Sequence, residues 1–267
     1  AVVVSCDGLQ NPNPASLMVL ADGGRSPLAS KIGVTKYEKL YKERALVTVV
    51  ESDLKHNGMA FERFTVHGPI ALLPMGESSF SLAWTMPRKE AERHLELSET
   101  EFLDRLQREF GYRAGLFQRA RKRRVYPLHQ SSVSPPSIQR TVLIGNAAHE
   151  VHPVGGQGFN LGLSDVAELA ELIANAIKNK TDIGHYSVID GYIKNRAYQT
   201  RRVIAFTDSL IGIFGITVPG AGLLRSLGLN TIEILPPVKR FLLRRTTGLS
   251  GKQTRLVRGL PLIVNRN

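Results

Sequence analysis

The sequence has 267 residues and is 42% hydrophobic, which is enough for about one large or two ordinary domains with a buried core. Its single cysteine, Cys6, excludes an internal disulfide framework and is typical of a reducing compartment. The formal net charge of +12 favours anionic partners such as a membrane surface, a phosphate-bearing cofactor or a nucleic acid. No recognised nucleic-acid motif accompanies that charge, so we expect no nucleic-acid partner.

The front of the chain reads as strands separated by turns. Residues 1–6 (AVVVSC) already have the pattern of a strand, and no signal peptide is visible. From this we expect a cytoplasmic chain that belongs to something larger. A second apolar strand at 17–20 leads into ADGGRSPL at 21–28. There Ser26 is a good N-cap and Pro27 suits the first helical position, which predicts a short helix ending near Gly33.

A β-rich region follows, with expected strands at 45–50, 60–66, 70–73 and 79–84. Turn residues between them indicate an antiparallel meander with one apolar face. The aromatic residues Phe61, Phe64, Phe80 and Trp84 on these strands are more often core than ligand-binding residues. Ser98 to Glu101 then has the pattern of a capping box, which predicts a helix that ends at Gly111.

A basic run comes next, at Arg119 and 121–124, before a loop at 131–137. A run of cations is usually a solvated face. A phosphate-binding or membrane-binding role is the less frequent alternative.

The most informative stretch runs from Thr141 to Ala170. A short apolar strand stops at Gly145, a loop rich in glycine follows, and the helical pattern resumes from about Leu161 to Lys178. Glycines let a ligand approach the backbone, and the start of a helix favours an anion or an electron-rich oxygen. The plain alternative is a simple strand-to-helix connection, since the spacing G-x-G-x-x-G is missing.

The last third is expected to be helical. A long helix is expected from about Tyr186 to Phe214, and the apolar stretch at 203–224 is interrupted by glycines, Asp208 and Pro219, unlike a membrane span. Leucines with flanking cations at 233–249 predict an amphipathic helix, which packs either on its own domain or on a lipid surface.

Several strings together resemble a known family. GNAAH at 145–149, Pro153, GGQGFN at 155–160 and ADGGRSPL at 21–28 are similar to motifs of the FAD-dependent aromatic hydroxylases of the p-hydroxybenzoate hydroxylase class. GMAFERFT at 58–65 is similar to a string of the ubiquinone-biosynthesis hydroxylases. Within that class the chain resembles the ubiquinone-biosynthesis hydroxylases, in particular the 2-octaprenyl-6-methoxyphenol hydroxylase group.

The resemblance implies a set of cofactor-binding residues. Asn146 stands where many members have an Asp that binds the ribityl or ribose hydroxyls of FAD, and Asn can still donate and accept hydrogen bonds. Pro153 would form a wall beside the flavin, and the amides near Gly158 would face a flavin carbonyl. The expected FAD-binding residues are Asp22, Gly23, Gly145, Asn146, Pro153, Gly155, Gly156, Gln157, Gly158, Phe159 and Asn160.

The resemblance also implies the substrate side and the reaction. Phe61, Phe64 and Trp84 would line the substrate side of the sheet, and a polyprenylated phenol would be hydroxylated with O2 and NAD(P)H. No catalytic base is identifiable, and His149 and His152 lack a third ligand, so we expect no metal. The implied location is the cytoplasm or the periphery of the inner membrane, with other ubiquinone-biosynthesis proteins as further partners.

The implied fold class is α+β (α/β), with an incomplete FAD-binding domain, an antiparallel substrate sheet and C-terminal helices. The expected division is 1–42 for the remnant of the FAD-binding domain, 43–138 for the substrate domain, 139–180 for the return to the FAD-binding domain, and 181–267 for the helical region. Because the G-x-G-x-x-G section is absent, we expect this chain alone to bind FAD poorly and to be inactive. The alternative is a non-enzymatic module that docks on a membrane or on a partner protein.

Overall fold

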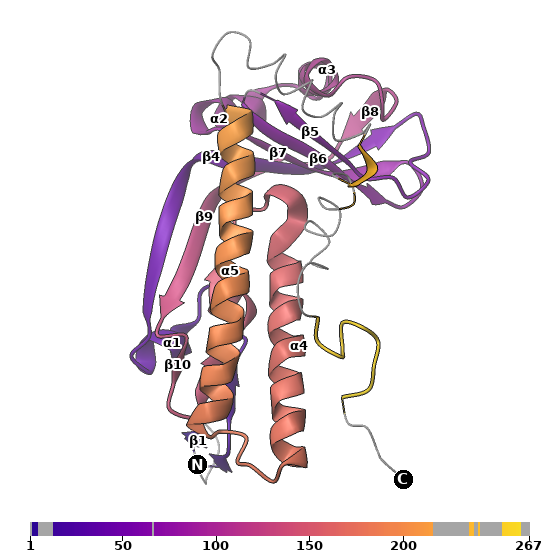
Figure 1. Ribbon diagram of the computed structural model, residues 1–267. Helices are drawn as coiled ribbons and strands as arrows, with labels where there is room; N and C mark the ends of the chain where they lie inside the picture. Colours follow the sequence, from indigo (N-terminus) through magenta and orange to yellow (C-terminus); the bar gives the residue numbers. More distant parts are fainter. Residues whose placement is uncertain are drawn as a thin grey trace. The chain divides into compact units, whose positions relative to one another are not determined.

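The structure is a computed structural model that describes residues 2–4, 13–65, 67–215, 235–237, 240 and 253–262. It is a mixed α/β protein with a large antiparallel sheet, as the sequence predicts (Figure 1). Its strands are β1 (Val2–Val4), β2 (Asn13–Ala15), β3 (Met18–Leu20), β4 (Thr35–Ser52), β5 (Phe61–Thr65), β6 (Gly68–Met75), β7 (Ser79–Pro87), β8 (Phe117–Ala120), β9 (Arg124–Ser134), β10 (Ser137–Ile138), β11 (Thr141–Leu143) and β12 (His149–Glu150). Its helices are α1 (Pro27–Lys31), α2 (Arg88–Glu96), α3 (Glu99–Phe110), the 3-10 turns η1 (Gly145–Ala147) and η2 (Val154–Gly156), α4 (Gln157–Lys178) and α5 (Tyr186–Gly215).

The chain forms two compact units, each made of separate pieces of sequence. The first contains residues 1–39, 130–208 and the described part of 230–267, and the second contains residues 40–129 and the described part of 209–229. Strands β4 and β9 pass from one unit to the other. The four-part division expected from the sequence stays a prediction.

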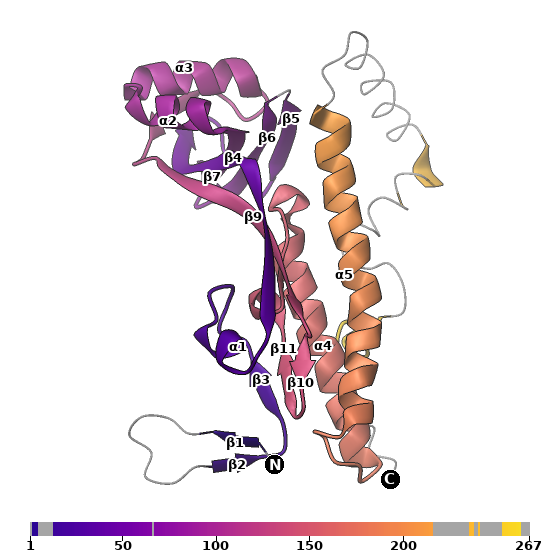
Figure 2. The ribbon, with the colours of Figure 1, turned by 90° about the vertical axis from the view of Figure 1, so that its left-hand side faces the viewer.

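The second unit is an antiparallel sheet with two helices on one face. Its strand order is β9-β4-β7-β6-β5, and β8 also pairs with β4. Figure 2 shows α2 and α3 together over one face of this sheet. Alternate strand residues point to that face, because the side-chain period of a strand is two. They form a core with the helices that includes Leu46, Val50, Ile70, Leu72, Phe80, Leu82, Trp84, Phe102 and Leu106.

The helices of this unit show what the sequence did and did not reveal. The capping box at Ser98 is present in α3, and Gly111 caps its end, as predicted. Helix α2 was not predicted, because RKEAERHLE has only one buried residue, Ala91, and so no apolar stripe. The expected strand at 45–50 lies in the second half of the much longer β4, whose first half is mostly polar and exposed.

The first unit contains a small sheet and two long helices. Strands β3 and β11 pair in parallel, with Leu20 opposite Leu143, and β10 adds an antiparallel edge to β11. Figure 1 shows α4 and α5 side by side, and Leu169 of α4 and Tyr192 of α5 share a buried cluster with Val142. Leu143 faces another cluster, which includes Ala29 of α1.

The long helix expected from about residue 186 to 214 is confirmed as α5, and the short helix at Pro27 is confirmed as α1. The amphipathic helix expected at 233–249 lies outside the described residues, apart from 235–237 and 240. Within the described part of the chain, no helix is both long and apolar enough to cross a membrane.

Candidate functional site

The two glycine-containing loops of the first unit start at the carboxyl ends of adjacent parallel strands. Leu20 ends β3 and Leu143 ends β11, and the amide of Ile144 donates to the carbonyl of Leu20 at 3.0 Å. The loop at 21–26 and the loop at 145–148 therefore begin next to each other. Open α/β sheets bind ligands at the carboxyl ends of such strands.

The first loop is held in shape by its own polar groups. Ser26 donates from Oγ to Oδ2 of Asp22 at 2.8 Å, and the same Oγ accepts from the amide of Ala29 at 3.0 Å. Gly23 has a φ of +87°, which side-chain-bearing residues rarely adopt. The Asp22 carboxylate accepts from the N-cap Ser26 of α1. Asp22 is also exposed, so the same carboxylate faces solvent.

The second loop turns through two left-handed glycines. Gly145 has φ +57° and Gly156 has φ +60°, and a Cβ on either would meet no atom within 4 Å. Open space therefore lies beside both positions. Gly162 of α4 comes close to this loop, since a Cβ there would lie 3.5 Å from the Cα of Gly145.

Helix α4 begins at Gln157, four residues earlier than the sequence pattern indicated. Its N-cap is Gly156, which has no side chain to accept from the first turn, and that turn has no acidic residue. The amides of Gly158 and Phe159 thus stand at the positive end of a 22-residue helix without a side-chain cap.

The predicted cofactor-binding residues differ in exposure. Phe159 is 76% exposed, whereas Gln157 is only 3% exposed and points into the protein. Asn160 is half-buried, and its carbonyl accepts from Ser164 Oγ at 2.8 Å. The exposed members of the predicted set are Asp22, Asn146, Pro153, Gly156 and Phe159; Gly23, Gly145 and Gly158 are intermediate, and Gly155 lies in η2.

A polar cluster joins the two loops. Glu150 accepts from Ser131 Oγ at 2.9 Å and pairs with Lys36 Nζ at 3.3 Å. Lys36 also donates to the carbonyl of Gly24. A Cβ on Gly24 would lie 2.2 Å from Oε1 of Glu150, so a side chain at this position would have to displace the Glu150 carboxylate from its contacts. The sequence analysis did not identify Glu150 or Lys36.

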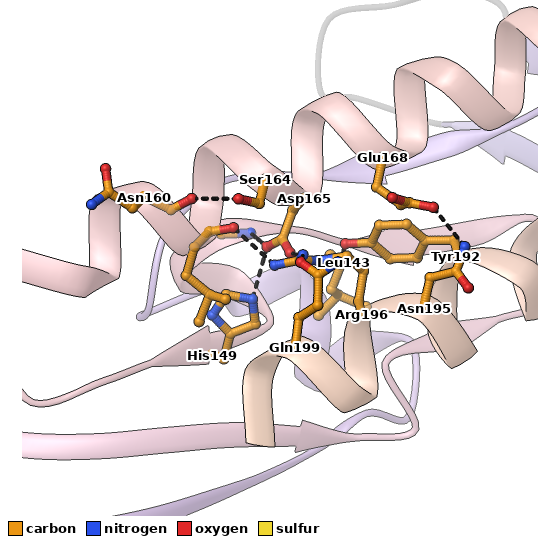
Figure 3. Close-up of polar contacts among 12 residues, drawn as sticks. Leu143, His149, Asn160, Ser164, Asp165, Glu168, Tyr192, Asn195, Arg196 and Gln199 are labelled. Atoms are coloured by element: carbon orange, nitrogen blue, oxygen red, sulfur yellow. Dashed lines mark hydrogen bonds and ion pairs between the residues drawn. The ribbon is translucent and has the colours of Figure 1, made fainter. Parts of the chain in front are cut away.

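A second, buried network supports the loop from below (Figure 3). Asp165 of α4 is fully buried, and its Oδ2 accepts from the amide of Gly145 at 2.8 Å and contacts Nε2 of His149 at 2.7 Å. Its Oδ1 accepts from Nε of Arg196 at 2.5 Å. Arg196, on α5, also donates from Nη2 to the carbonyl of Leu161 at 3.1 Å. Charged hydrogen bonds of this network thus connect α5, α4 and the loop.

Burial alone would raise the pKa of Asp165. The hydrogen bond and charge of His149, the charge of Arg196 and the amide of Gly145 outweigh burial, so the pKa lies below its ordinary value. Burial also raises the pKa of Tyr192, which keeps its hydroxyl protonated within 3.4 Å of the carbonyl of Leu143.

The sequence contains a signal for this network in the spacing of its buried residues. Leu161, Asp165 and Leu169 lie four residues apart and are all buried, so an acid occupies the apolar stripe of α4. Tyr192 and Arg196 have the same spacing on α5. A charged residue on a buried stripe indicates a partner of opposite charge.

A cavity of about 380 Å³ adjoins the network inside the first unit. Its polar lining consists of the network residues His149, Asp165, Tyr192 and Arg196, together with Ser132, Thr200 and Arg201. Its apolar lining consists of Val133, Pro136, Leu143, Ala148, Ile193, Ala197 and Ile204.

The three aromatic residues predicted for the substrate side lie in the second unit. Trp84 is 4% exposed in the core under the helices, where its ring lies 4.9 Å from that of His94. Phe61 packs against the same core and contacts Phe80 edge-on. Phe64 is three residues further along β5 and therefore lies on the face opposite to Phe61.

That opposite face carries small residues that the sequence analysis did not select. Val47, Ala83 and Ala71 lie directly opposite one another on β4, β7 and β6. These small, half-buried side chains form a flat apolar strip that ends at Glu62 of β5, which lies opposite Ala71. Among the residues described, no group of three His, Cys, Asp or Glu side chains could hold a metal ion.

Glycine loops lie at the ends of two adjacent parallel strands, beside a helix start without a side-chain cap. This arrangement is typical of proteins that bind nucleotide-type cofactors. The FAD binding domain family model matches residues 4–207. The chain belongs to this FAD binding domain family.

Known relatives agree with that membership. The chain is 35% identical over 251 residues to Ubiquinone hydroxylase UbiL of Rhodospirillum rubrum, covering 93% of this chain and 58% of that protein. It is 28% identical over 257 residues to the mitochondrial Ubiquinone biosynthesis monooxygenase COQ6 of Homo sapiens, covering 84% of this chain and 55% of that protein. The chain thus spans little more than half the length of these two relatives.

A solved structure supports the fold. The p-nitrophenol 4-monooxygenase PnpA of Pseudomonas putida superposes with a TM-score of 0.66 at 20% identity, covering 86% of this chain and 59% of that one. At this level of identity the likeness concerns the fold alone.

Proposed function

We propose that the chain is part of an FAD-dependent, NAD(P)H-using monooxygenase that hydroxylates a polyprenylated phenol in ubiquinone biosynthesis, similar to 2-octaprenyl-6-methoxyphenol hydroxylase. The observation that carries the proposal is the meeting of the Asp22 and Gly145 loops at the ends of β3 and β11, beside the uncapped start of α4. The family membership and the names of the relatives support the choice of cofactor and pathway.

The residues present fit a flavin. No atom lies within 4 Å of where a Cβ on Gly145 or Gly156 would be, so a ligand can approach the backbone closely at both positions. The first turn of α4 has no acidic side chain that would repel an electron-rich carbonyl.

Bound FAD would take electrons from NAD(P)H and activate O2 for transfer to the phenol ring. The chain would orient and shield it. The amides of Gly158 and Phe159 would donate to a flavin carbonyl, and Pro153 would exclude water from one side of the ring. Asn146 would hydrogen-bond the ribityl or ribose hydroxyls, and Asp22 would lie near the pyrophosphate.

The substrate would bind on the small-residue face of the second unit. Phe64 and the row of Val47, Ala83 and Ala71 offer an apolar surface for a prenylated ring. Phe61 and Trp84, which pack in the core, would support this face from behind. The protein would act at the periphery of the inner membrane, together with other ubiquinone-biosynthesis proteins.

The 267 residues contain no G-x-G-x-x-G section to hold the adenosine and pyrophosphate of FAD. We therefore propose that this chain binds FAD poorly by itself, and that activity needs an N-terminal dinucleotide-binding section in the same polypeptide.

The test uses the protein that carries such a section. With FAD, NAD(P)H and a prenylated phenol, we expect O2 uptake and a product one oxygen atom heavier by mass spectrometry. NAD(P)H oxidation that is insensitive to the phenol, with no oxygenated product, would contradict the hydroxylase assignment.

A further inference from the structure

One stretch of the second unit has a charge pattern that the proposed reaction does not use. Residues 111–124 (GYRAGLFQRARKRR) contain no Asp or Glu, and their cations are Arg113, Arg119, Arg121, Lys122, Arg123 and Arg124. The stretch forms the loop after α3, then β8, then the link into β9. Figure 1 shows β8 next to α3.

Most of these cations face solvent. Arg113, Arg119, Lys122 and Arg124 are exposed, and no ion pair joins them to another residue of the described chain. Arg121 is 70% exposed and reaches Glu51 only at 3.9 Å. Arg123 differs, because its guanidinium packs 4.9 Å from the ring centre of Phe102 and donates to the carbonyl of Leu97.

Large apolar side chains project from the same region. Tyr112 is 72% exposed, Leu116 is 51% exposed and Leu54, on the loop after β4, is 54% exposed. Exposed apolar side chains that lie together suggest an interaction surface more strongly than single ones do.

The two loops that carry these side chains are fixed to each other. The amide of Leu116 donates to Oδ1 of Asp53 at 2.7 Å, and the amide of Asp53 donates to the carbonyl of Leu116 at 3.1 Å. Gly115 has φ +86°, and a Cβ there would lie 2.9 Å from Cγ of Leu54. These hydrogen bonds and the close approach at Gly115 therefore hold the two loops next to each other.

We propose that Leu54, Tyr112, Leu116 and the exposed cations of 111–124 form a surface that docks on an anionic lipid bilayer. Lipid headgroups carry the complementary charge, and the apolar tips can enter the boundary between headgroups and acyl chains. Tyrosine is favoured at that boundary. A nucleic acid would use the cations but would leave the two leucines exposed, so the observations favour lipid.

This surface extends the peripheral membrane association proposed above by naming the residues that would make it. It does not depend on flavin binding, because it lies outside the loops of the first unit. If this surface did not bind lipid, the proposed hydroxylase function would therefore be unaffected.

The test is co-sedimentation of the protein with vesicles of phosphatidylcholine alone and of phosphatidylcholine with phosphatidylglycerol. We expect binding only to the anionic vesicles, weakened by added salt. The variant Arg119→Gln/Lys122→Gln/Arg124→Gln should lose about tenfold or more in affinity, since each cation near the surface contributes about fivefold.

Two further variants complete the design. Tyr112→Ser/Leu116→Ser should weaken binding to anionic vesicles while leaving all cations in place. The matched control is Lys31→Gln/Lys178→Gln/Lys180→Gln, which removes the same charge from exposed positions of the first unit and should bind almost as the wild type does.

Equal binding to neutral and anionic vesicles would overturn the proposal, as would equal losses in the cation variant and its control. Tighter binding to a DNA duplex than to anionic vesicles, lost in the cation variant, would assign the surface to nucleic acid instead. Flavin content measured in parallel should be unchanged in all of these variants.

Discussion

At the scale of single residues, the glycine loop depends on a carboxylate that belongs to a helix. Asp165 bonds the amide of Gly145 and His149 on one side and Arg196 on the other. All three side chains are at least nine-tenths buried. Removing one member of a buried ion pair leaves the other charge without compensation, which costs more than the pair itself contributes.

We expect Asp165→Asn to lower the free energy of unfolding by about 3–5 kcal/mol, because Arg196 is then left charged and buried. Urea unfolding at neutral pH measures the change. Adding Arg196→Met to Asp165→Asn should recover part of the loss, which a double-mutant cycle reports as coupling. Additive losses from the two substitutions would show that the two side chains act independently.

The same carboxylate predicts a pH dependence. The pKa of Asp165 is lower in the folded protein than the ordinary value of 3.8. Its contribution to the free energy of unfolding is therefore complete above pH 3.8 and is lost as the pH falls through the lower pKa of the folded state. The difference in the free energy of unfolding between wild type and Asp165→Asn should therefore shrink as the pH falls below about 4. A difference that grew on acidification would contradict the assigned direction.

The sequence predicted the role of single residues correctly where the groups that they contact are close along the chain. Ser26, Ser98 and Gly111 act as caps because the groups they bond lie within four residues along the chain. Asp165 and Arg196 were missed because their partners are 16 to 31 residues away. Glu150 and Lys36 are 114 residues apart, and no local pattern connects them.

At the scale of elements, α3 shows how an apolar stripe holds a helix on a sheet. Phe102, Leu106 and Phe110 recur at spacing four and are all buried against the strands. Their neighbours Asp104 and Arg105 are exposed. The stripe was visible in the sequence, which is why this helix was predicted with its correct ends.

Leu106→Ala should lower the free energy of unfolding by about 2–5 kcal/mol, because it leaves a cavity in the core of the second unit. Arg105→Ala, on the exposed side of the same turn, should change it by less than about 0.5 kcal/mol. Thermal and urea unfolding of both variants check the prediction. Similar effects of the two substitutions would mean that α3 does not pack on the sheet through this face.

Other elements were only partly predictable. Helix α4 starts at Gln157 because Gly156 turns left-handed there, whereas the apolar periodicity begins only at Leu161. Helix α2 lacks an apolar stripe, and the first half of β4 is polar, so neither has a periodic signal. Their formation depends on pairing and packing with distant segments rather than on local pattern.

At the scale of the whole molecule, the chain returns to its first unit after residues 40–129 have formed most of the second unit. The parallel pairing of β3 with β11 joins segments about 120 residues apart and brings the two family motifs together. The resemblance predicted this return, since both motifs belong to one cofactor site. Composition and periodicity alone could not have predicted it, because no residue pattern specifies which strands pair.

The central claim is that the start of α4 faces a flavin, and Phe159 offers a direct test. Phe159 is 76% exposed in the first turn of α4, whereas Val166 is 50% exposed further along the same helix. A glutamate in place of Phe159 should repel an electron-rich ring. It should also stabilise the helix slightly, because an acid is favoured near a helix N-terminus.

The decisive measurement is an FAD titration, followed by flavin fluorescence, of the protein with its dinucleotide-binding section. Phe159→Glu should weaken FAD binding by about tenfold or more without lowering the melting temperature, and Val166→Glu should leave FAD binding within about twofold of wild type. If Phe159→Glu bound FAD as tightly as the wild type, the start of α4 would not face the flavin.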